Sequence, residues 1–276
     1  MSDEKIQIRR PQTQSEPVVR QSEVPTFPSD TIPLPTRGWY YDESNPLSSG
    51  EIELKQMTAR EEDILANQEL IRKGKVLDKL LQSIIVNKQI DTGDILISDK
   101  NAIFIGIRRL AYGDNYPVNV TCPSCGNRSK VDINLGELKN KEIDIESHPK
   151  GKNSFQFTLP KSGTQITYKL LCQKDDELID KELTGLKKID KENSRELTTR
   201  LKYIITSVNG IGTQDVIRKF VDEQLLAVDS RSLREHIKNN TPDVDMRFDF
   251  KCPSCEHERR SDIPVGASFL WPDLES

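Results

Sequence analysis

Four of the five cysteines in this 276-residue sequence form two identical motifs. The tetrapeptide Cys-Pro-Ser-Cys occurs at residues 122–125 and again at 252–255. Two intervening residues form a tight turn that directs both sulfurs to one point, and proline at the second position fixes the φ angle of that turn. Four thiolates at about 2.3 Å complete a tetrahedron around Zn²⁺ and leave no open position for water. The motifs therefore predict one structural zinc ion held by Cys122, Cys125, Cys252 and Cys255.

The two motifs lie far apart in the chain, with 126 residues between Cys125 and Cys252. Compact zinc modules separate their two cysteine pairs by roughly 12 to 20 residues. A shared site therefore requires the intervening segment to leave and return at neighbouring points. Two alternatives stay open: two half-sites completed by other ligands or subunits, or no metal. His257, two residues beyond Cys255, is the nearest substitute ligand.

Cations flank both motifs, at Arg128, Lys130, Lys251, Arg259 and Arg260. They are explained as compensation for the negative charge of a zinc–thiolate centre. The alternative function is a zinc-ribbon nucleic-acid-binding factor, in which these cations contact phosphates. The net charge of −4 does not favour nucleic acid as a partner, because such binding draws its affinity from Lys and Arg neutralising phosphates.

The sequence around each motif alternates between apolar and polar residues, which predicts strands. Residues 116–135 and 244–265 then form two hairpins with the cysteines at their tips, a zinc ribbon split in two. The region between them, 136–243, is predicted to be a mixed α/β insertion with a charged linker at 137–153. It contains a second hairpin around Pro160-Lys-Ser-Gly163 and mostly helices over 174–240, one of them with an apolar face formed by Leu201, Ile204, Ile205 and Val208.

The N-terminal part has two predicted regions. Residues 1–36 carry six prolines and almost no apolar periodicity, which indicates a disordered arm. Residues 37–115 are predicted to form a helical domain, beginning with an aromatic cluster at Trp39-Tyr40-Tyr41 that packs in a core or an interface.

Helix signals divide that domain. Thr58 and Glu61 have the spacing of a capping box, and a third helix is predicted to start after Ser98 and to end at Gly113. Apolar residues at helical spacing predict a buried stripe between them, formed by Val76, Leu77, Leu80, Leu81, Ile84 and Ile85. The fold class predicted is thus α+β.

Composition gives further expectations. Hydrophobic residues make up 34% and charged residues 30% of the chain, and no apolar stretch reaches the ~20 residues needed to span a bilayer. We therefore expect a soluble protein made in a cytoplasm, without membrane contact. In such a reducing compartment, closely spaced cysteines indicate metal rather than disulfides.

Other residues offer no catalytic set, so no enzyme activity and no small-molecule substrate are predicted. Asp91-Thr92-Gly93 matches the aspartic-protease triplet, but it occurs once and between predicted helices, whereas that chemistry needs two carboxylates. A turn is expected there, and a hydrolase using Asp91 is the weakest hypothesis. Cys172 is interpreted as a small buried side chain on a strand.

Several segments, taken in order, resemble a known family. They are LPTRGWYYD, GEIELKQMTAREEDIL, LIRKGKVLDKLL, NAIFIGIRRLAYGDNYPVNVTCPSCG, VDMRFDFKCPSCEHE and a terminal FLWPDL. Together they look like the baseplate hub proteins of T-even-like tailed bacteriophages, from about residue 31 to the end.

The resemblance implies a structural or assembly role in the tail baseplate of the virion, reached from the host cytoplasm during assembly. It also implies other phage baseplate and tail proteins as partners. The C-terminal tail, 266–276, either binds such a partner or packs on its own domain through Phe269-Leu270-Trp271-Pro272.

Overall fold

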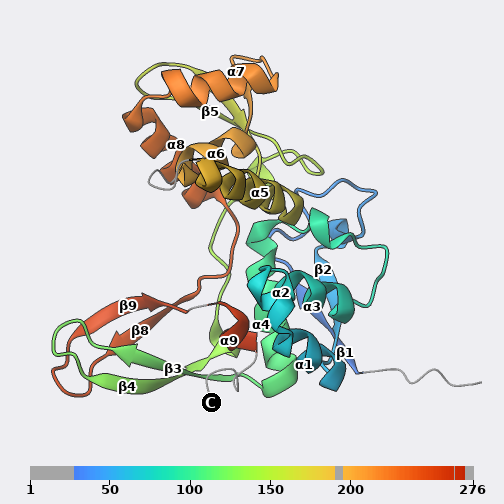
Figure 1. Cartoon of the computed structure of the whole chain (residues 1–276), viewed down its shortest axis with the longest axis vertical. Helices are drawn as coiled ribbons and strands as arrows, with labels where there is room; N and C mark the ends of the chain where they lie inside the picture. Colours follow the sequence, from blue (N-terminus) through green and yellow to red (C-terminus); the bar gives the residue numbers. More distant parts are fainter. Residues whose placement is uncertain (1–27, 190–194, 264, 271–276) are drawn as a thin grey trace, which may run out of the picture.

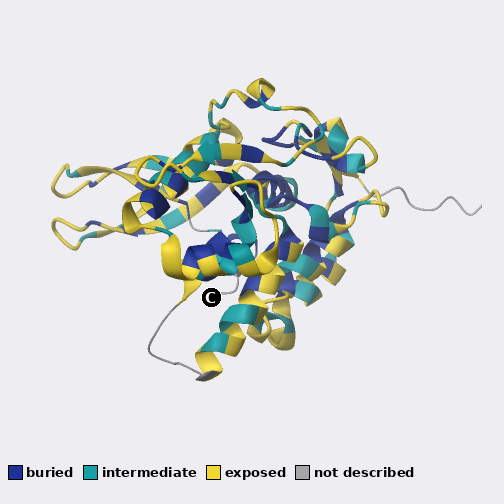
Figure 2. Ribbon diagram, turned by 90° about the horizontal axis from the view of Figure 1, so that it is seen from above, coloured by how far each residue is buried: buried dark blue, intermediate teal, exposed yellow. Residues whose placement is uncertain are grey.

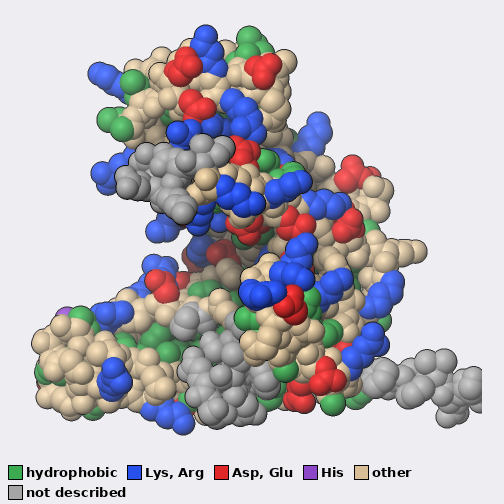
Figure 3. Space-filling view, viewed as in Figure 1, with side chains coloured by type: hydrophobic (Ala, Val, Ile, Leu, Met, Phe, Trp, Pro, Cys, Tyr) green, Lys and Arg blue, Asp and Glu red, His purple; other side chains and the backbone are tan. Residues whose placement is uncertain are grey.

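The computed structural model describes residues 28–189, 195–263 and 265–270. Figure 1 shows a body of short strands and helices, a second lobe on one side of it, and a long arm of hairpins projecting from it. In the space-filling view a hollow separates the lobe from the arm (Figure 3). The mixture of helices and sheets confirms the predicted α+β class.

The body combines a two-stranded antiparallel sheet with four helices. β1 (Ser29–Pro33) pairs with β2 (Glu51–Lys55), and α1 (Ala59–Ala66), α2 (Gln68–Arg72), α3 (Val76–Ile84) and α4 (Ile97–Tyr112) follow. Short 3₁₀ turns lie at η1 (Pro46–Ser49) and η2 (Thr92–Asp94). α4 approaches the sheet closely, because a Cβ added at Gly106 would lie 2.7 Å from Ile32 Cγ1.

The helix signals in the sequence are confirmed. The Glu61 carboxylate accepts from the Thr58 amide at 2.9 Å and from its hydroxyl at 2.7 Å, which fixes the start of α1. The predicted stripe over α3 and Ile85 is core: five of its residues are buried, and Leu77 is half-buried against them. α4 ends where Gly113 adopts φ +79° with extended ψ, a backbone conformation that glycine tolerates more readily than residues with a Cβ.

The predicted arm over 1–36 is wrong at its C-terminal end. Residues 29–33 form β1, and Leu34 and Thr36 are buried. The amide and hydroxyl of Thr36 both donate to the buried carboxylate of Asp99, at 3.0 and 2.8 Å. These bonds link residues 63 positions apart, so local sequence could not indicate them. Residues 1–27 lie outside the described residues.

The aromatic cluster after the arm belongs to the core. Tyr40 and Tyr41 are buried. The Tyr41 hydroxyl donates to Asp99 at 2.7 Å and accepts from the Leu96 amide at 2.9 Å. Tyr41 therefore ties the segment after β1 to the start of α4.

The lobe contains a three-stranded antiparallel sheet with helices. The strands are β5 (Phe155–Thr158), β6 (Gln165–Tyr168) and β7 (Ile205–Val208). The helices are α5 (Gln173–Ile189), α6 (Glu196–Ile204), α7 (Gln214–Lys219) and α8 (Ala227–Asn240), with a π-helical turn η5 (Phe220–Gln224) after α7. Before the lobe, the 3₁₀ turn η3 (Leu135–Glu137) contacts α4 of the body, and the 3₁₀ turn η4 (Ile145–Ser147) follows it. The hairpin predicted around residues 160–163 is confirmed.

One helical prediction in the lobe is wrong. The apolar spacing predicts Ile204 and Val208 on the same face of one helix, but α6 ends at Ile204 and residues 205–208 form β7. Ile205, Thr206 and Val208 are β-branched and suit a strand, and β6 provides the partner, with Ile166 opposite Val208. The apolar spacing of residues 201–208 allows either a helix or a strand. Backbone pairing with β6, on the side opposite β5, selects the strand for residues 205–208.

The body and the lobe share one hydrophobic core. A single cluster of buried apolar side chains extends from Leu34 and Tyr40 in the body to Phe155, Tyr168 and Leu233 in the lobe. The backbone also joins them, since the Ile97 amide donates to the Leu171 carbonyl at 2.9 Å. Figure 2 shows buried residues concentrated in the body and lobe, whereas the ends of the arm are exposed.

Candidate metal centre

The arm consists of two antiparallel hairpins of the same design. β3 (Asn115–Thr121) pairs with β4 (Arg128–Asn134), and β8 (Arg247–Lys251) pairs with β9 (Glu258–Asp262). Alternating side chains face each other between the hairpins, and Val120, Phe250, Cys122 and Cys252 form a small separate core. The hairpins around the two motifs are therefore present as predicted.

Each Cys-Pro-Ser-Cys motif forms the same turn. The Cys122 amide donates to the Asn127 carbonyl at 2.8 Å, and the Gly126 amide to the Cys122 carbonyl at 2.9 Å. In the second turn the Cys252 amide donates to the His257 carbonyl at 2.9 Å, and the Glu256 amide to the Cys252 carbonyl at 3.0 Å. One backbone geometry thus presents both pairs of sulfurs.

The four motif sulfurs meet at the tip of the arm, all within 4.8 Å of one another. The Sγ atoms of Cys122 and Cys255 are 3.7 Å apart, and those of Cys125 and Cys252 are 3.6 Å apart. A tetrahedron with metal–sulfur bonds of about 2.3 Å has edges of about 3.8 Å. A disulfide would need about 2.05 Å. The spacing therefore fits a tetrahedral thiolate site for zinc.

Electrostatics at the tip favour a bound cation. The amide of Ser254, with that of Cys255, lowers the pKa of the Cys252 thiol to about 6. The amide of Asn127 also favours the Cys125 thiolate, but the adjacent sulfurs, led by Cys255, outweigh it and raise the pKa of Cys125 to about 12. Four crowded sulfurs cannot all ionise without a positive charge between them.

The two ends of the predicted insertion, 136–243, lie side by side, as a metal site shared by both motifs requires. Asn140 and Val244 form an antiparallel bridge. On either side of it the Lys141 amide donates to the Asp243 carbonyl and the Asp245 amide to the Lys139 carbonyl, both at 2.8 Å. We call these two paired segments, 139–141 and 243–245, the neck.

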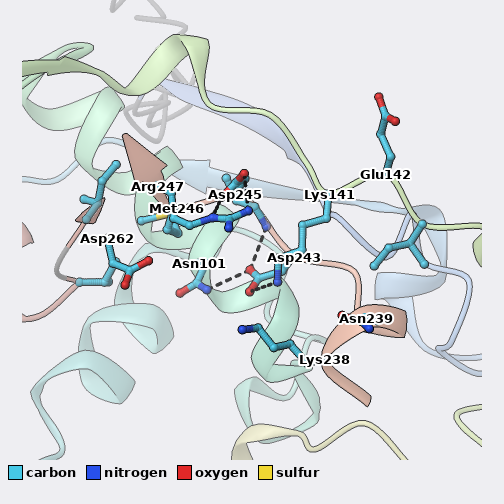
Figure 4. A pocket seen from close by; sticks show the side chains of 14 residues that line it. Asn101, Lys141, Glu142, Lys238, Asn239, Asp243, Asp245, Met246, Arg247 and Asp262 are labelled. Atoms are coloured by element: carbon cyan, nitrogen blue, oxygen red, sulfur yellow. Dashed lines mark hydrogen bonds and ion pairs between the residues drawn. The ribbon is translucent and has the colours of Figure 1, made fainter. Parts of the chain in front are cut away.

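Side chains reinforce the neck at a surface pocket beside it (Figure 4). The Asp243 carboxylate accepts from the Asn101 amide group at 2.9 Å and pairs with Lys141 at 3.4 Å. The Asp245 carboxylate pairs with Arg247 at 2.6 Å and Arg260 at 2.8 Å. These contacts, which sequence reasoning missed, join the neck to α4 and to the arm. The Asn101–Asp243 bond spans 142 residues, so no local signal marks it.

The remaining candidate residues lie elsewhere. Among the described residues, the cluster with metal-binding spacing contains the four cysteines and not His257. Cys172 is half-buried beside Asp175. Asp91 caps the turn η2 by accepting from the Gly93 amide at 2.9 Å, which confirms the predicted turn.

These features define an α+β protein whose projecting arm carries a four-cysteine cluster built from two distant motifs. The chain belongs to the family described as T4 bacteriophage base plate protein, whose family model matches residues 41–271. The resemblance to phage baseplate proteins is thereby confirmed, and a structural role in the phage tail baseplate follows. Neither the curated proteins nor the solved structures gave a significant match. None of the described helices is long and apolar enough to cross a bilayer.

Proposed function

We propose that this protein is a non-enzymatic, zinc-stabilised component or assembly factor of the baseplate hub, acting through contacts with other phage tail proteins. The observation that carries the proposal is the four-cysteine tip of the arm in a member of the baseplate family. Its sulfur–sulfur distances of 3.6 and 3.7 Å suit a structural zinc ion.

Zinc would give the arm the rigidity that its own core lacks. Among the described residues, the arm's core cluster contains four buried residues, two of them motif cysteines. A two-layer ribbon with so few apolar contacts is marginal in water. Bound metal would hold the two hairpins together through Cys122, Cys125, Cys252 and Cys255, and so present their outer faces in fixed orientation. The reducing host cytoplasm during assembly would keep the thiols available before incorporation into the virion.

The alternative, a nucleic-acid-binding ribbon, has less support. Lys251 pairs with Glu258 at 3.2 Å and Arg260 with Asp245 at 2.8 Å, so part of the predicted basic patch is neutralised within the chain. A hydrolase centred on Asp91 is also disfavoured, because Lys174 holds that carboxylate at 2.8 Å.

Metal content of the purified protein tests the zinc site. We expect about one zinc per chain, lost or much weakened in Cys252→Ser together with a lower melting temperature. The matched control is Cys172→Ser, which removes the one cysteine outside the cluster and should retain the metal. Folded, freshly prepared protein without zinc would refute the site.

Assembly in infected cells tests the baseplate role separately. A phage whose own copy of the gene is disabled should accumulate incomplete baseplates, and the protein supplied in trans should restore them. Normal baseplates without the protein would contradict the proposed function, whatever the metal content.

A further inference from the structure

The outer faces of the two hairpins differ in whether their charged side chains have partners of opposite charge. On the β8–β9 face every cross-strand pair joins opposite charges: Arg247 with Asp262, Asp249 with Arg260, and Lys251 with Glu258. Lys251 and Glu258 lie 3.2 Å apart, and Arg260 and Asp249 lie 4.0 Å apart. This face is therefore neutralised by its own residues.

The β3–β4 face has no such matching near the tip. Arg128 lies opposite Thr121, and Lys130 lies opposite Asn119. All four side chains are exposed or border a shallow hollow in the surface, and the described residues provide no ion pair for either cation. The nearest acid on this face, Asp132, lies further from the tip and opposite Pro117.

Compensation of the zinc–thiolate charge does not account for this difference. Both turns contribute two cysteines to the same cluster, so both hairpins experience the same negative centre. The second hairpin nevertheless adds Glu256 and Glu258 beside its motif, whereas the corresponding positions of the first are Gly126 and Arg128. The arm thus has one neutral face and one face with uncompensated positive charge.

From this asymmetry we infer that the outer face of β3–β4 binds an extended acidic segment of a neighbouring baseplate protein through Arg128 and Lys130. The inference rests on the proposed baseplate role. The two cations are two residues apart on one strand, which separates them by about 6.8 Å. Carboxylates at alternate positions of an extended partner strand have the same spacing, so each can meet one cation. Asn119 and Thr121 supply adjacent polar groups for the partner backbone.

A protein segment fits this face better than nucleic acid does. The guanidinium of Arg128 can bind a carboxylate through two parallel hydrogen bonds. Two cations would neutralise only about two phosphates, and the affinity of nucleic-acid-binding proteins is built from many such contacts. The chain's net charge of −4 opposes a long polyanion but not a short acidic segment at one positive face.

Charge reversal on this face tests the inference. The double variant Arg128→Glu/Lys130→Glu, supplied in trans to the disabled phage, should enter baseplates or their assembly intermediates at least about tenfold less than wild type, equivalent to about 1.4 kcal/mol. The neutral variant Arg128→Gln/Lys130→Gln should show a smaller loss in the same direction. Zinc content and melting temperature of each purified variant establish that the arm is intact, and the neutral variant provides the test if charge reversal prevents folding.

The matched control lies on the other hairpin. Lys251→Glu/Glu258→Lys exchanges two charges and preserves their pairing, so it should behave like wild type. Wild-type incorporation in the same assay separates a failure of this inference from a failure of the proposed baseplate role. Normal incorporation of intact Arg128→Glu/Lys130→Glu protein would overturn the inference.

Zero-length cross-linking identifies the chemistry of the contact. A carbodiimide converts a lysine amine and an adjacent carboxylate to an amide, so treated particles should yield a peptide that joins Lys130 to an Asp or Glu of another baseplate protein. A 30-nucleotide single-stranded DNA serves as the competing probe. DNA binding that is lost in the Glu variant, with no such cross-link, would assign the face to nucleic acid instead.

Discussion

At the scale of single residues, the two cysteine turns provide a comparison within one molecule. Position 126 is glycine at φ +72°, and the equivalent position 256 is glutamate at φ +56°. Both amides donate to the carbonyl of the first cysteine of their motif. Because the left-handed conformation costs a residue with a Cβ about 1–2 kcal/mol, Glu256 is held there by the hydrogen bonds of the turn rather than by its own preference.

Replacing Glu256 by glycine should therefore stabilise the protein. We expect a gain of up to about 1 kcal/mol in the free energy of unfolding, because glycine removes the strain but has a larger entropy in the unfolded chain. Chemical denaturation at fixed zinc concentration measures it. The reciprocal change, Gly126→Glu, should destabilise by about 1–2 kcal/mol; equal stability of the two variants would contradict this account of the turns.

At the scale of elements, one buried carboxylate holds three segments of the body together. Glu61 in α1 is fully buried and accepts from Thr58, from Lys55 at the end of β2 and from Ser83 in α3. Burial opposes its ionisation, but hydrogen bonds led by Lys55, followed by Ser83 and Thr58, outweigh that effect and lower the pKa of Glu61 to about 2.

Glu61→Gln should therefore destabilise the protein in a pH-dependent manner. A carboxyl group with a lowered pKa stabilises the fold above its unfolded value of 4.5, and this contribution disappears as the pH falls toward 2. At pH 7 we expect a loss of about 1–3 kcal/mol. The difference from wild type should shrink steadily below pH 4.5 in urea denaturation curves.

The control for that experiment is the next residue. Glu62 is exposed, so Glu62→Gln should leave the free energy of unfolding almost unchanged at each pH. A pH-independent difference between wild type and Glu61→Gln would show that lost packing, and not lost charge, causes the destabilisation.

At the scale of the whole molecule, the C-terminal helix α9 (Ala267–Leu270) closes the base of the arm onto the body. Phe269 is fully buried, and its ring packs edge-on against Tyr116 of β3 at a centroid distance of 4.9 Å. The Phe269 carbonyl accepts from the Arg108 guanidinium of α4 at 3.3 Å. Of the two roles left open for the tail, its described part shows packing on its own chain. Residues 271–276 lie outside the described residues.

Phe269→Ala should therefore reduce stability rather than partner binding alone. Truncation of a buried phenylalanine costs about 3–5 kcal/mol, which should appear as a lower melting temperature and reduced solubility. The control is Leu178→Ala, in which the side chain is 50% exposed and the expected change is small. An unaltered melting temperature with impaired baseplate assembly would assign Phe269 to an interface instead.

Much of the site could be predicted from sequence because its determinants are local. Cys-Pro-Ser-Cys defines its own turn, the alternation around each motif defines the strands, and Thr58 with Glu61 marks the start of α1. The domain boundaries proposed at 115, 135 and 243 stay predictions, and the body and the insertion share one core across them.

The sequence by itself determined the α+β class, the four candidate ligands and the resemblance to phage baseplate proteins. Only the tertiary structure decided that residues 29–33 and 205–208 are strands, that the neck closes at Asn140 and Val244, and that one hairpin face lacks charge partners. Turn chemistry and side-chain periodicity act over a few neighbouring residues. The choice of a strand's partner, or of a carboxylate's donors, depends on groups many residues away that only folding brings together.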